Sequence, residues 1–135
     1  MHRRIVACGR GRVTQLPVIR KEVIALTGKR TPSLVYIGAA TYEDNGSFEL
    51  QTKGFVEDGC IVQHLKLTDM NTIPPKKELE TIILNTDIVL FSGGNTLFAM
   101  TRLRRLKMDV ILKKALESGW FGFLSRLTFR INMSM

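Results

Sequence analysis

The chain alternates between two kinds of segment, and this alternation constrains the fold more than any other feature of its 135 residues. Short apolar runs, most of them rich in β-branched residues, are each followed by a segment with helical periodicity. Repeated strand–helix units predict a parallel sheet with right-handed crossovers and helices on both faces. We therefore expect an α/β fold built as a three-layer, doubly wound and mostly parallel sheet.

The expected elements follow from these runs and from the turn residues between them. We predict strands over 3–9, 33–41, 60–67 and 87–94, and helices over 16–28, 48–59, 76–85 and 95–106, with 108–119 continuing or following the last helix. The length fits one domain. We assign 1–119 to this domain and interpret 120–135 as an aberrant tail, because it has no acidic residue and no stable period.

Charge and hydropathy exclude several classes of protein. The net charge of +8 is scattered over helix ends and surface faces without interleaved aromatic residues, so we expect a solvated basic surface and no nucleic-acid partner. The basic segment 101–114 is interpreted as a helix that covers the sheet, with Leu103, Leu106, Val110 and Ile111 facing inward. No apolar run approaches the ~20 residues of a membrane span, so no membrane partner is expected.

The two cysteines, Cys8 and Cys60, lie at the ends of apolar runs and are predicted to be buried thiols. No signal peptide is recognisable at the amino terminus. Together these features predict a cytoplasmic protein. His2 and His64 have no neighbouring cysteine or carboxylate at ligand spacing, so we expect no metal, and no motif calls for a cofactor.

Ligands of doubly wound folds bind where parallel strands end, which draws attention to the run FSGGNT. Gly93 and Gly94 allow positive φ and close approach to a bound group, and Asn95 or Thr96 can cap the next helix and leave its first N–H groups facing that group. The alternative is a tight strand-to-helix turn with a polar cap.

Two further runs lie at the same predicted edge. The run CGRGR places Gly9 and Gly11 after the first strand, but no third glycine completes a dinucleotide fingerprint, so a glycine-rich turn is the preferred interpretation. The run YEDNG carries Glu43 and Asp44, acidic residues that are commonplace in turns.

Four runs in this order, IVACGRG, LVYIGAAT, GFVEDGCIVQHLKL and above all DIVLFSGGNTLFAM, resemble the dipeptidase E family of serine peptidases. That family includes α-aspartyl dipeptidases and has cyanophycinases as relatives. The resemblance covers roughly residues 3 to 119. It implies a fold like that of class I glutamine amidotransferase domains, within the flavodoxin-like group, and incomplete here at the carboxyl terminus. It also implies hydrolysis of small, aspartyl-type peptides as the activity of the full-length family.

The resemblance assigns roles to particular residues. The family's Gly-Gly-Asn turn, matched by Gly93, Gly94 and Asn95, contributes to the oxyanion hole beside a serine on a Gly-x-Ser-Ala-Gly elbow. The elbow falls about thirty residues after that turn in the family. Ser125 lies there, but the glycine before it and the Ala-Gly after it are missing. The family's first strand ends in consecutive glycines, which Arg10 interrupts here. The triad histidine and its acidic partner lie farther downstream in the family.

We interpret the tail as out-of-frame translation of the missing elbow, since a one-nucleotide shift over codons chosen for 124–126 yields Ser-Ala-Gly. A divergent or differently spliced carboxyl terminus is the alternative. The chain is thus expected to be an inactive amino-terminal portion of a serine peptidase, or else a non-catalytic small-anion-binding or partner-dependent module. An uncovered apolar surface would favour homo-oligomers or poor solubility.

Overall fold

The computed structural model describes residues 4–7, 15–117 and 121–124. Its core is one sheet of five parallel strands in the order β1-β5-β4-β2-β3. The strands are β1 (Arg4–Ala7), β2 (Ser33–Ile37), β3 (Ile61–His64), β4 (Ile88–Phe91) and β5 (Phe121–Leu124). The helices are α1 (Pro17–Thr27), α2 (Asn45–Glu57), α3 (Lys76–Leu84), α4 (Thr96–Arg105) and α5 (Met108–Glu117), with a 3-10 turn, η2, at Ala39–Thr41.

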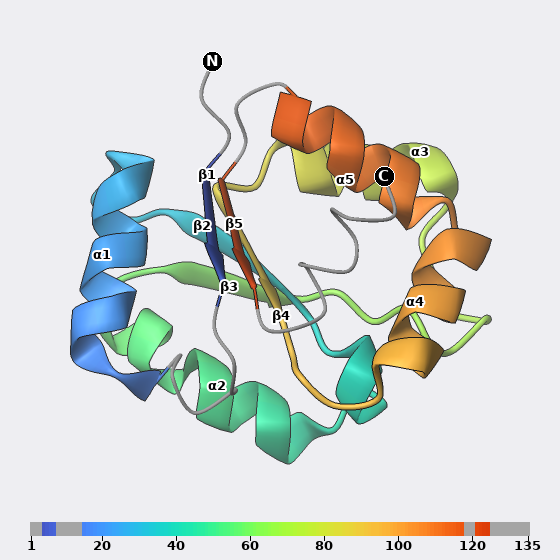
Figure 1. The fold of residues 1–135 in the computed structure, drawn as a ribbon, viewed down its shortest axis with the longest axis horizontal. Coiled ribbons are helices and arrows are strands. Elements are labelled where there is room, and N and C mark those ends of the chain that lie inside the picture. The colour runs from blue at the N-terminus through green and yellow to red at the C-terminus, as the bar shows by residue number, and fades with distance from the viewer. Residues whose placement is uncertain (1–3, 8–14, 118–120, 125–135) are drawn as a thin grey trace.

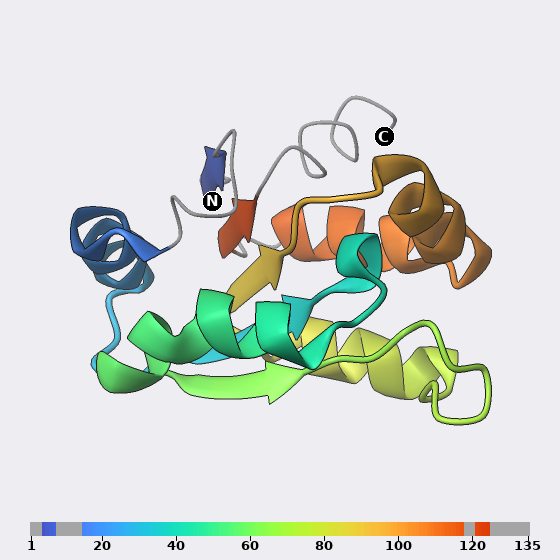
Figure 2. The same cartoon turned by 90° about the horizontal axis from the view of Figure 1, so that it is seen from below.

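The helices form a layer on each face of the sheet, with α1 and α2 on one side and α3, α4 and α5 on the other (Figures 1 and 2). Side chains alternate accordingly along the central strands. On β2, Leu34 and Tyr36 pack toward α1 and α2, whereas Val35 and Ile37 pack toward the other three helices. Strand β4 is buried over its whole length. The predicted three-layer parallel α/β fold is confirmed.

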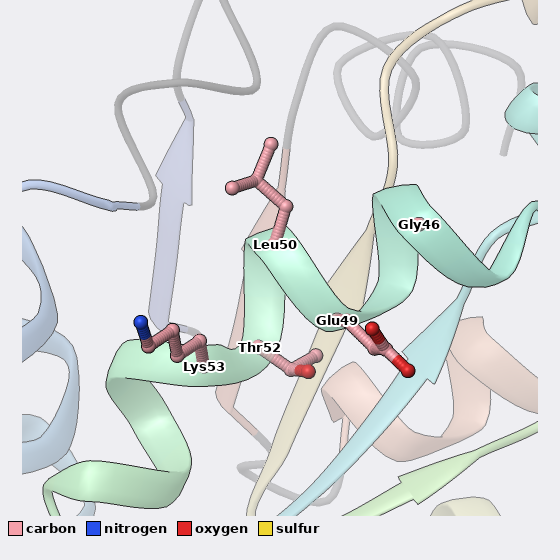
Figure 3. A pocket seen from close by; sticks show the side chains of 5 residues that line it. All are labelled: Gly46, Glu49, Leu50, Thr52 and Lys53. Carbon is pink, nitrogen blue, oxygen red and sulfur yellow. The ribbon is translucent and has the colours of Figure 1, made fainter.

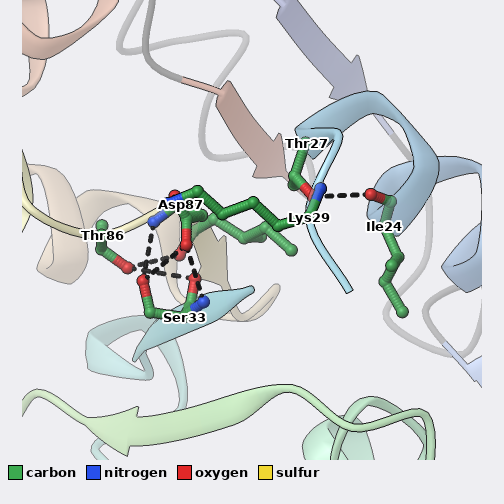
Figure 4. A network of polar contacts seen from close by, with 7 residues as sticks. Ile24, Thr27, Lys29, Ser33, Thr86 and Asp87 are labelled. Atoms are coloured by element: carbon green, nitrogen blue, oxygen red, sulfur yellow. Dashed lines mark hydrogen bonds and ion pairs between the residues drawn. The ribbon is translucent and has the colours of Figure 1, made fainter. Parts of the chain in front are cut away.

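A polar network joins the amino ends of β2 and β4 (Figure 4). The carboxylate of Asp87 accepts hydrogen bonds from the Ser33 backbone N–H at 2.9 Å and from the Ser33 hydroxyl at 3.0 Å, and it forms an ion pair with Lys29 at 2.7 Å. Thr86 donates from its hydroxyl to the carbonyl oxygen of Ser33 at 3.3 Å. These bonds fix where the two strands begin relative to each other.

Several boundaries differ from the predicted ones for identifiable reasons. Helix α2 begins three residues early because Asp44 is its N-cap, accepting a hydrogen bond from the Ser47 N–H at 2.8 Å. The predicted strand 33–41 stops at Ile37 because the chain then turns, with the Thr41 and Glu43 N–H groups donating to the Gly38 carbonyl oxygen. The residues after the strand are nevertheless apolar, since Ala39 and Ala40 are buried in η2.

Two other differences concern the carboxyl-terminal part of the chain. Helices α4 and α5 are separate because Lys107 takes a positive φ of 61° between them. Val110 was wrongly predicted to face inward and is 57% exposed, whereas Leu103 and Ile111 are buried as expected. Strand β5 was not predicted; it lies between β1 and β4 and belongs to the segment 120–135 that we interpreted as an aberrant tail.

Candidate functional site

The turn between β4 and α4 lies at the carboxyl edge of the sheet, where Figure 1 shows it running beside η2. Gly94 has a φ of +134°, a conformation that residues with a β-carbon rarely adopt. Asn95 is the N-cap of α4, and its side-chain oxygen accepts a hydrogen bond from the Phe98 N–H at 3.0 Å. The sequence-based expectation of a glycine turn followed by a polar cap is met by Gly94 and Asn95.

This turn packs directly against the loop that follows β2. The Asn95 N–H donates to the Ala40 carbonyl oxygen at 2.7 Å, and the Ser92 N–H donates to the Ile37 carbonyl oxygen at 3.1 Å. A β-carbon at Gly94 would lie 2.4 Å from that same Ala40 oxygen. Glycine is therefore required here both by the backbone angle and by the close approach of the two loops.

The N–H groups of Gly93 and Gly94 are the backbone donors of the turn between β4 and α4, which we call the donor turn. No hydrogen bond between described residues uses either of them. Gly93 is partly exposed and Gly94 is exposed. They precede the N-terminus of α4, whose dipole favours negative charge at this position. The arrangement can stabilise a carboxylate, a phosphate or a developing oxyanion.

Glu43 fastens the loop after β2 to the loop after β3. Its carboxylate accepts hydrogen bonds from the Leu67 N–H, from the Thr68 hydroxyl and, at 3.1 Å, from the Thr68 N–H. Glu43 has a φ of 60°, so these bonds hold a residue in the left-handed region. Asp44, the other acidic residue of this run, is used as the helix cap. Glu43 is thus a structural tether at the edge.

Changing Glu43 to Gln should lower the free energy of unfolding by about 1–2 kcal/mol, because the amide nitrogen would face donors that now share a carboxylate. Urea unfolding of the two proteins measures this difference. Glu49→Gln is the matched control, since Glu49 is exposed on α2 and should tolerate the change within about 0.5 kcal/mol. Equal midpoints for Glu43→Gln and the unchanged chain would show that the tether contributes nothing.

A cluster of hydroxyl groups lies beneath the turn. Ser92 is fully buried, and its oxygen accepts a hydrogen bond from the Thr41 hydroxyl at 3.4 Å. Burial raises the pKa of the neighbouring Tyr36 phenol, and the Thr41 and Ser92 hydroxyls offset part of that rise. Tyr36 therefore stays protonated at neutral pH. Within the described ranges Ser92 has no hydrogen bond to a histidine or carboxylate, so it lacks the partner that would make it a nucleophile.

His64 is the histidine that the structure describes, and it is engaged by aromatic rings. Its ring stacks on Phe48 with centroids 4.2 Å apart and meets the edge of Tyr36 at 5.4 Å. Burial lowers the pKa of His64, and Lys66 adds to the effect while Glu43 opposes it. His64 is therefore a neutral packing residue at pH 7. Among the described residues no group of three or more His, Cys, Asp or Glu side chains could hold a metal ion.

Two hollows lined by described residues lie away from the turn. One, of about 510 Å³, is lined by Gly46, Glu49, Leu50, Thr52 and Lys53, and Figure 3 shows that all five come from α2. Another, of about 250 Å³, lies between α3 and the first residues of β2 and β3, at the opposite end of the strands. Neither is lined by residues of the β4–α4 turn.

The sequence-predicted site residues divide into two groups. Gly93, Gly94 and Asn95 are brought together against the loop after β2. Gly9, Gly11 and Ser125 lie outside the described residues. Their neighbours in sequence nevertheless end at this edge, since Ala7 of β1 and Phe91 of β4 are both register partners of Leu124. Ser125 is the residue that follows Leu124 in the chain.

Sequence analysis missed one residue of the site, Tyr42. Its hydroxyl accepts a hydrogen bond from the Asn95 side-chain NH₂ group at 2.7 Å, and its ring packs on Phe98 with centroids 4.8 Å apart. The only local signal was an aromatic residue at the start of a turn-rich run directly after a predicted strand.

The fold and this turn define a class: parallel α/β proteins with a glycine donor turn at the carboxyl edge of a central strand. The model of peptidase family S51 matches residues 5–122, and the chain belongs to that family. A search of the curated proteins finds no match.

Solved structures with the same fold include one from Listeria monocytogenes EGD-e that was assigned as a peptidase E protein. It has a TM-score of 0.68 and 17% identity, over 91% of this chain and 58% of that one. A peptidase from an acI-B1 actinobacterium has a TM-score of 0.62 and 15% identity, over 90% of this chain and 52% of that one. The chain thus spans little more than half the length of these structures.

No helix in the described part of the chain is long and apolar enough to cross a membrane.

Proposed function

We propose that the chain is the amino-terminal portion of a serine-type peptidase for small, aspartyl-type peptides, and that by itself it binds such peptides without cleaving them. The observation that carries this proposal is the position of β5. Its last residue, Leu124, is in register with Phe91 of β4, two residues before Gly93. A nucleophile placed directly after β5 would therefore start from the strand next to the donor turn.

In the proposed full-length reaction, an elbow serine attacks the scissile carbonyl carbon and passes its proton to a histidine. The carbonyl oxygen becomes an alkoxide, which the Gly93 and Gly94 N–H groups stabilise. In this chain Ser125 stands at the elbow position between Leu124 and Arg126, without the glycines of the motif. No histidine base is paired with a serine among the described residues, which supports the proposal that this chain is inactive.

The test is an assay of the purified chain with L-aspartyl-L-leucine, measured by the release of free leucine. We expect no turnover above the uncatalysed rate. Turnover that survives repurification and disappears in Ser125→Ala would contradict the inactive assignment. Turnover that persists unchanged in Ser125→Ala would point to a contaminating enzyme, and repurification would then remove it.

A second candidate is a non-catalytic module that binds a small anion or depends on a partner. It is favoured by the two glycine N–H groups at the N-terminus of a ten-residue helix, because such donors bind carboxylate or phosphate without any catalytic group. Binding of inorganic phosphate in preference to the aspartyl dipeptide at these amides would favour this module over the peptidase portion.

We further propose that the protein is cytoplasmic, binds neither nucleic acid nor membranes, and forms homo-oligomers. The last point is supported by β3, which is the outermost strand on its side of the sheet and carries Ile61 with 67% of its surface exposed. Exposed strand edges with apolar residues favour association.

A further inference from the structure

The loop after β2 contains two consecutive residues in a backbone conformation that glycine normally takes. Tyr42 has a φ of 53° and Glu43 a φ of 60°. Residues with a β-carbon enter this region at a cost in free energy, so neighbouring contacts must hold them there. Glu43 is held by its carboxylate bonds to Leu67 and Thr68. The corresponding contacts of Tyr42 are with α4 and its cap.

Tyr42 makes two contacts although 61% of its surface is exposed. Its ring packs on Phe98, tilted by 50°, and its hydroxyl oxygen accepts from the Asn95 Nδ2 at 2.7 Å. The Asn95 Oδ1 atom accepts at the same time from the Phe98 N–H at 3.0 Å. The Asn95 amide is therefore fixed at both ends, with its oxygen on the helix and its nitrogen on Tyr42.

This amide adjoins the donor turn. The Asn95 backbone N–H is bonded to Ala40 at 2.7 Å, and Gly94 lies against the same Ala40 oxygen. Ala40, two residues before Tyr42, thus holds the two loops together, while the Gly93 and Gly94 N–H groups make no hydrogen bond within the described residues. A rotation of the Asn95 side chain would loosen the cap and the turn together.

We infer that Tyr42 is a positioning residue whose hydroxyl fixes Asn95 and thereby holds the backbone of Gly93 and Gly94 in place at the carboxyl edge of the sheet. The use of their N–H groups as donors rests on the proposed function, whereas the positioning itself does not. The opposing view is that Tyr42 only packs on Phe98. In that case removal of its hydroxyl alone would change nothing at the turn.

The test is amide hydrogen exchange, followed by NMR on the full ¹⁵N-labelled chain, with Tyr42→Phe compared with the unchanged protein. Phenylalanine keeps the ring contact and removes only the acceptor. We expect exchange of the Asn95 backbone N–H to become about three- to tenfold faster, with the Gly93 and Gly94 amide resonances displaced. Exchange of the Val89 N–H in β4 should stay unchanged, which separates a local release from a loss of global stability.

Asn95→Ser removes the donor of the same hydrogen bond, because serine is a good N-cap but carries no NH₂ group that could donate to Tyr42. It should displace the Gly93 and Gly94 resonances as Tyr42→Phe does. In the double variant, the displacement of these resonances and the exchange rate of the Asn95 N–H should be no larger than in either single variant. This variant also decides the matter if Tyr42→Phe fails to fold. Additive effects of the two changes would overturn the inference, as would glycine resonances that stay in place in both variants.

These outcomes are independent of catalysis. Local release of the turn in Tyr42→Phe supports the positioning role even if the chain does not bind the aspartyl dipeptide. A failure to bind the dipeptide would contradict only the proposed function. A turn that does not respond to either variant overturns the positioning role even if the peptide binds.

Discussion

Gly94→Ala should lower the free energy of unfolding by about 3 kcal/mol and separate the donor turn from the loop after β2. A β-carbon at this position would lie 2.4 Å from the Ala40 carbonyl oxygen and 3.0 Å from its carbonyl carbon. Both are backbone atoms, so no side chain can rotate away. The φ of +134° adds strain for any residue other than glycine. The Asn95 N–H bond to Ala40 should be lost with this movement.

The matched control for this change is Gly28→Ala. Gly28 also has a positive φ, 68°, but a β-carbon there would meet no atom within 4 Å. The control should therefore show only the backbone penalty of about 1 kcal/mol. Urea unfolding of the three proteins measures both differences. Equal losses in the two variants would show that the contact with Ala40 does not constrain the turn.

The second large effect is expected at Asp87. Asp87→Ala should cost about 2–3 kcal/mol, because it leaves the Ser33 N–H, the Ser33 hydroxyl and Lys29 without their shared acceptor. Asp87→Asn keeps the shape and one oxygen acceptor and should cost less. Thermal or urea unfolding at pH 7 gives both values.

The effect of Asp87 should depend on pH in a defined direction. Burial raises the pKa of this carboxyl, but the bonds from Lys29 and Ser33 outweigh burial and hold the pKa below its usual value. The unfolded chain therefore binds the proton more readily, and the stabilisation is present above about pH 4 and is lost as the pH falls through the folded-state pKa. The difference in free energy of unfolding between the unchanged chain and Asp87→Asn should therefore decrease as the pH falls over that range. A difference that stays constant down to pH 2 would contradict this account of the network.

The layers of the fold could be predicted because the runs that form β2 and β4 are apolar at almost every position. Such runs are typical of parallel strands that are covered by helices on both faces. Residue type predicted a positive φ within the Gly93–Gly94 pair and a cap at Asn95 or Thr96, and the structure has the positive φ at Gly94 and the cap at Asn95. Strand β5 could not be predicted in this way. It has four residues, FGFL, with a glycine and no β-branched residue.

What makes β5 a strand in the structure is pairing on both sides. Gly122 is the register partner of Ile5 on β1 and of Val89 on β4, positions distant in sequence. The role of Tyr42 was hidden for a similar reason. Its conformation and its bond to Asn95 depend on the meeting of two loops, 53 residues apart in sequence, at one edge of the sheet. Local propensity carries no information about such contacts.

The most direct test of the central claim is a titration of the ¹⁵N-labelled chain with L-aspartyl-L-leucine, followed by NMR, with free leucine measured in the same sample. We predict that the resonances of Gly93, Gly94 and Asn95 move with increasing peptide while no leucine is released. Unchanged resonances at these three residues, or changes confined to the hollow on α2 at Glu49 and Lys53, would contradict the claim that the β4–α4 turn is the peptide site.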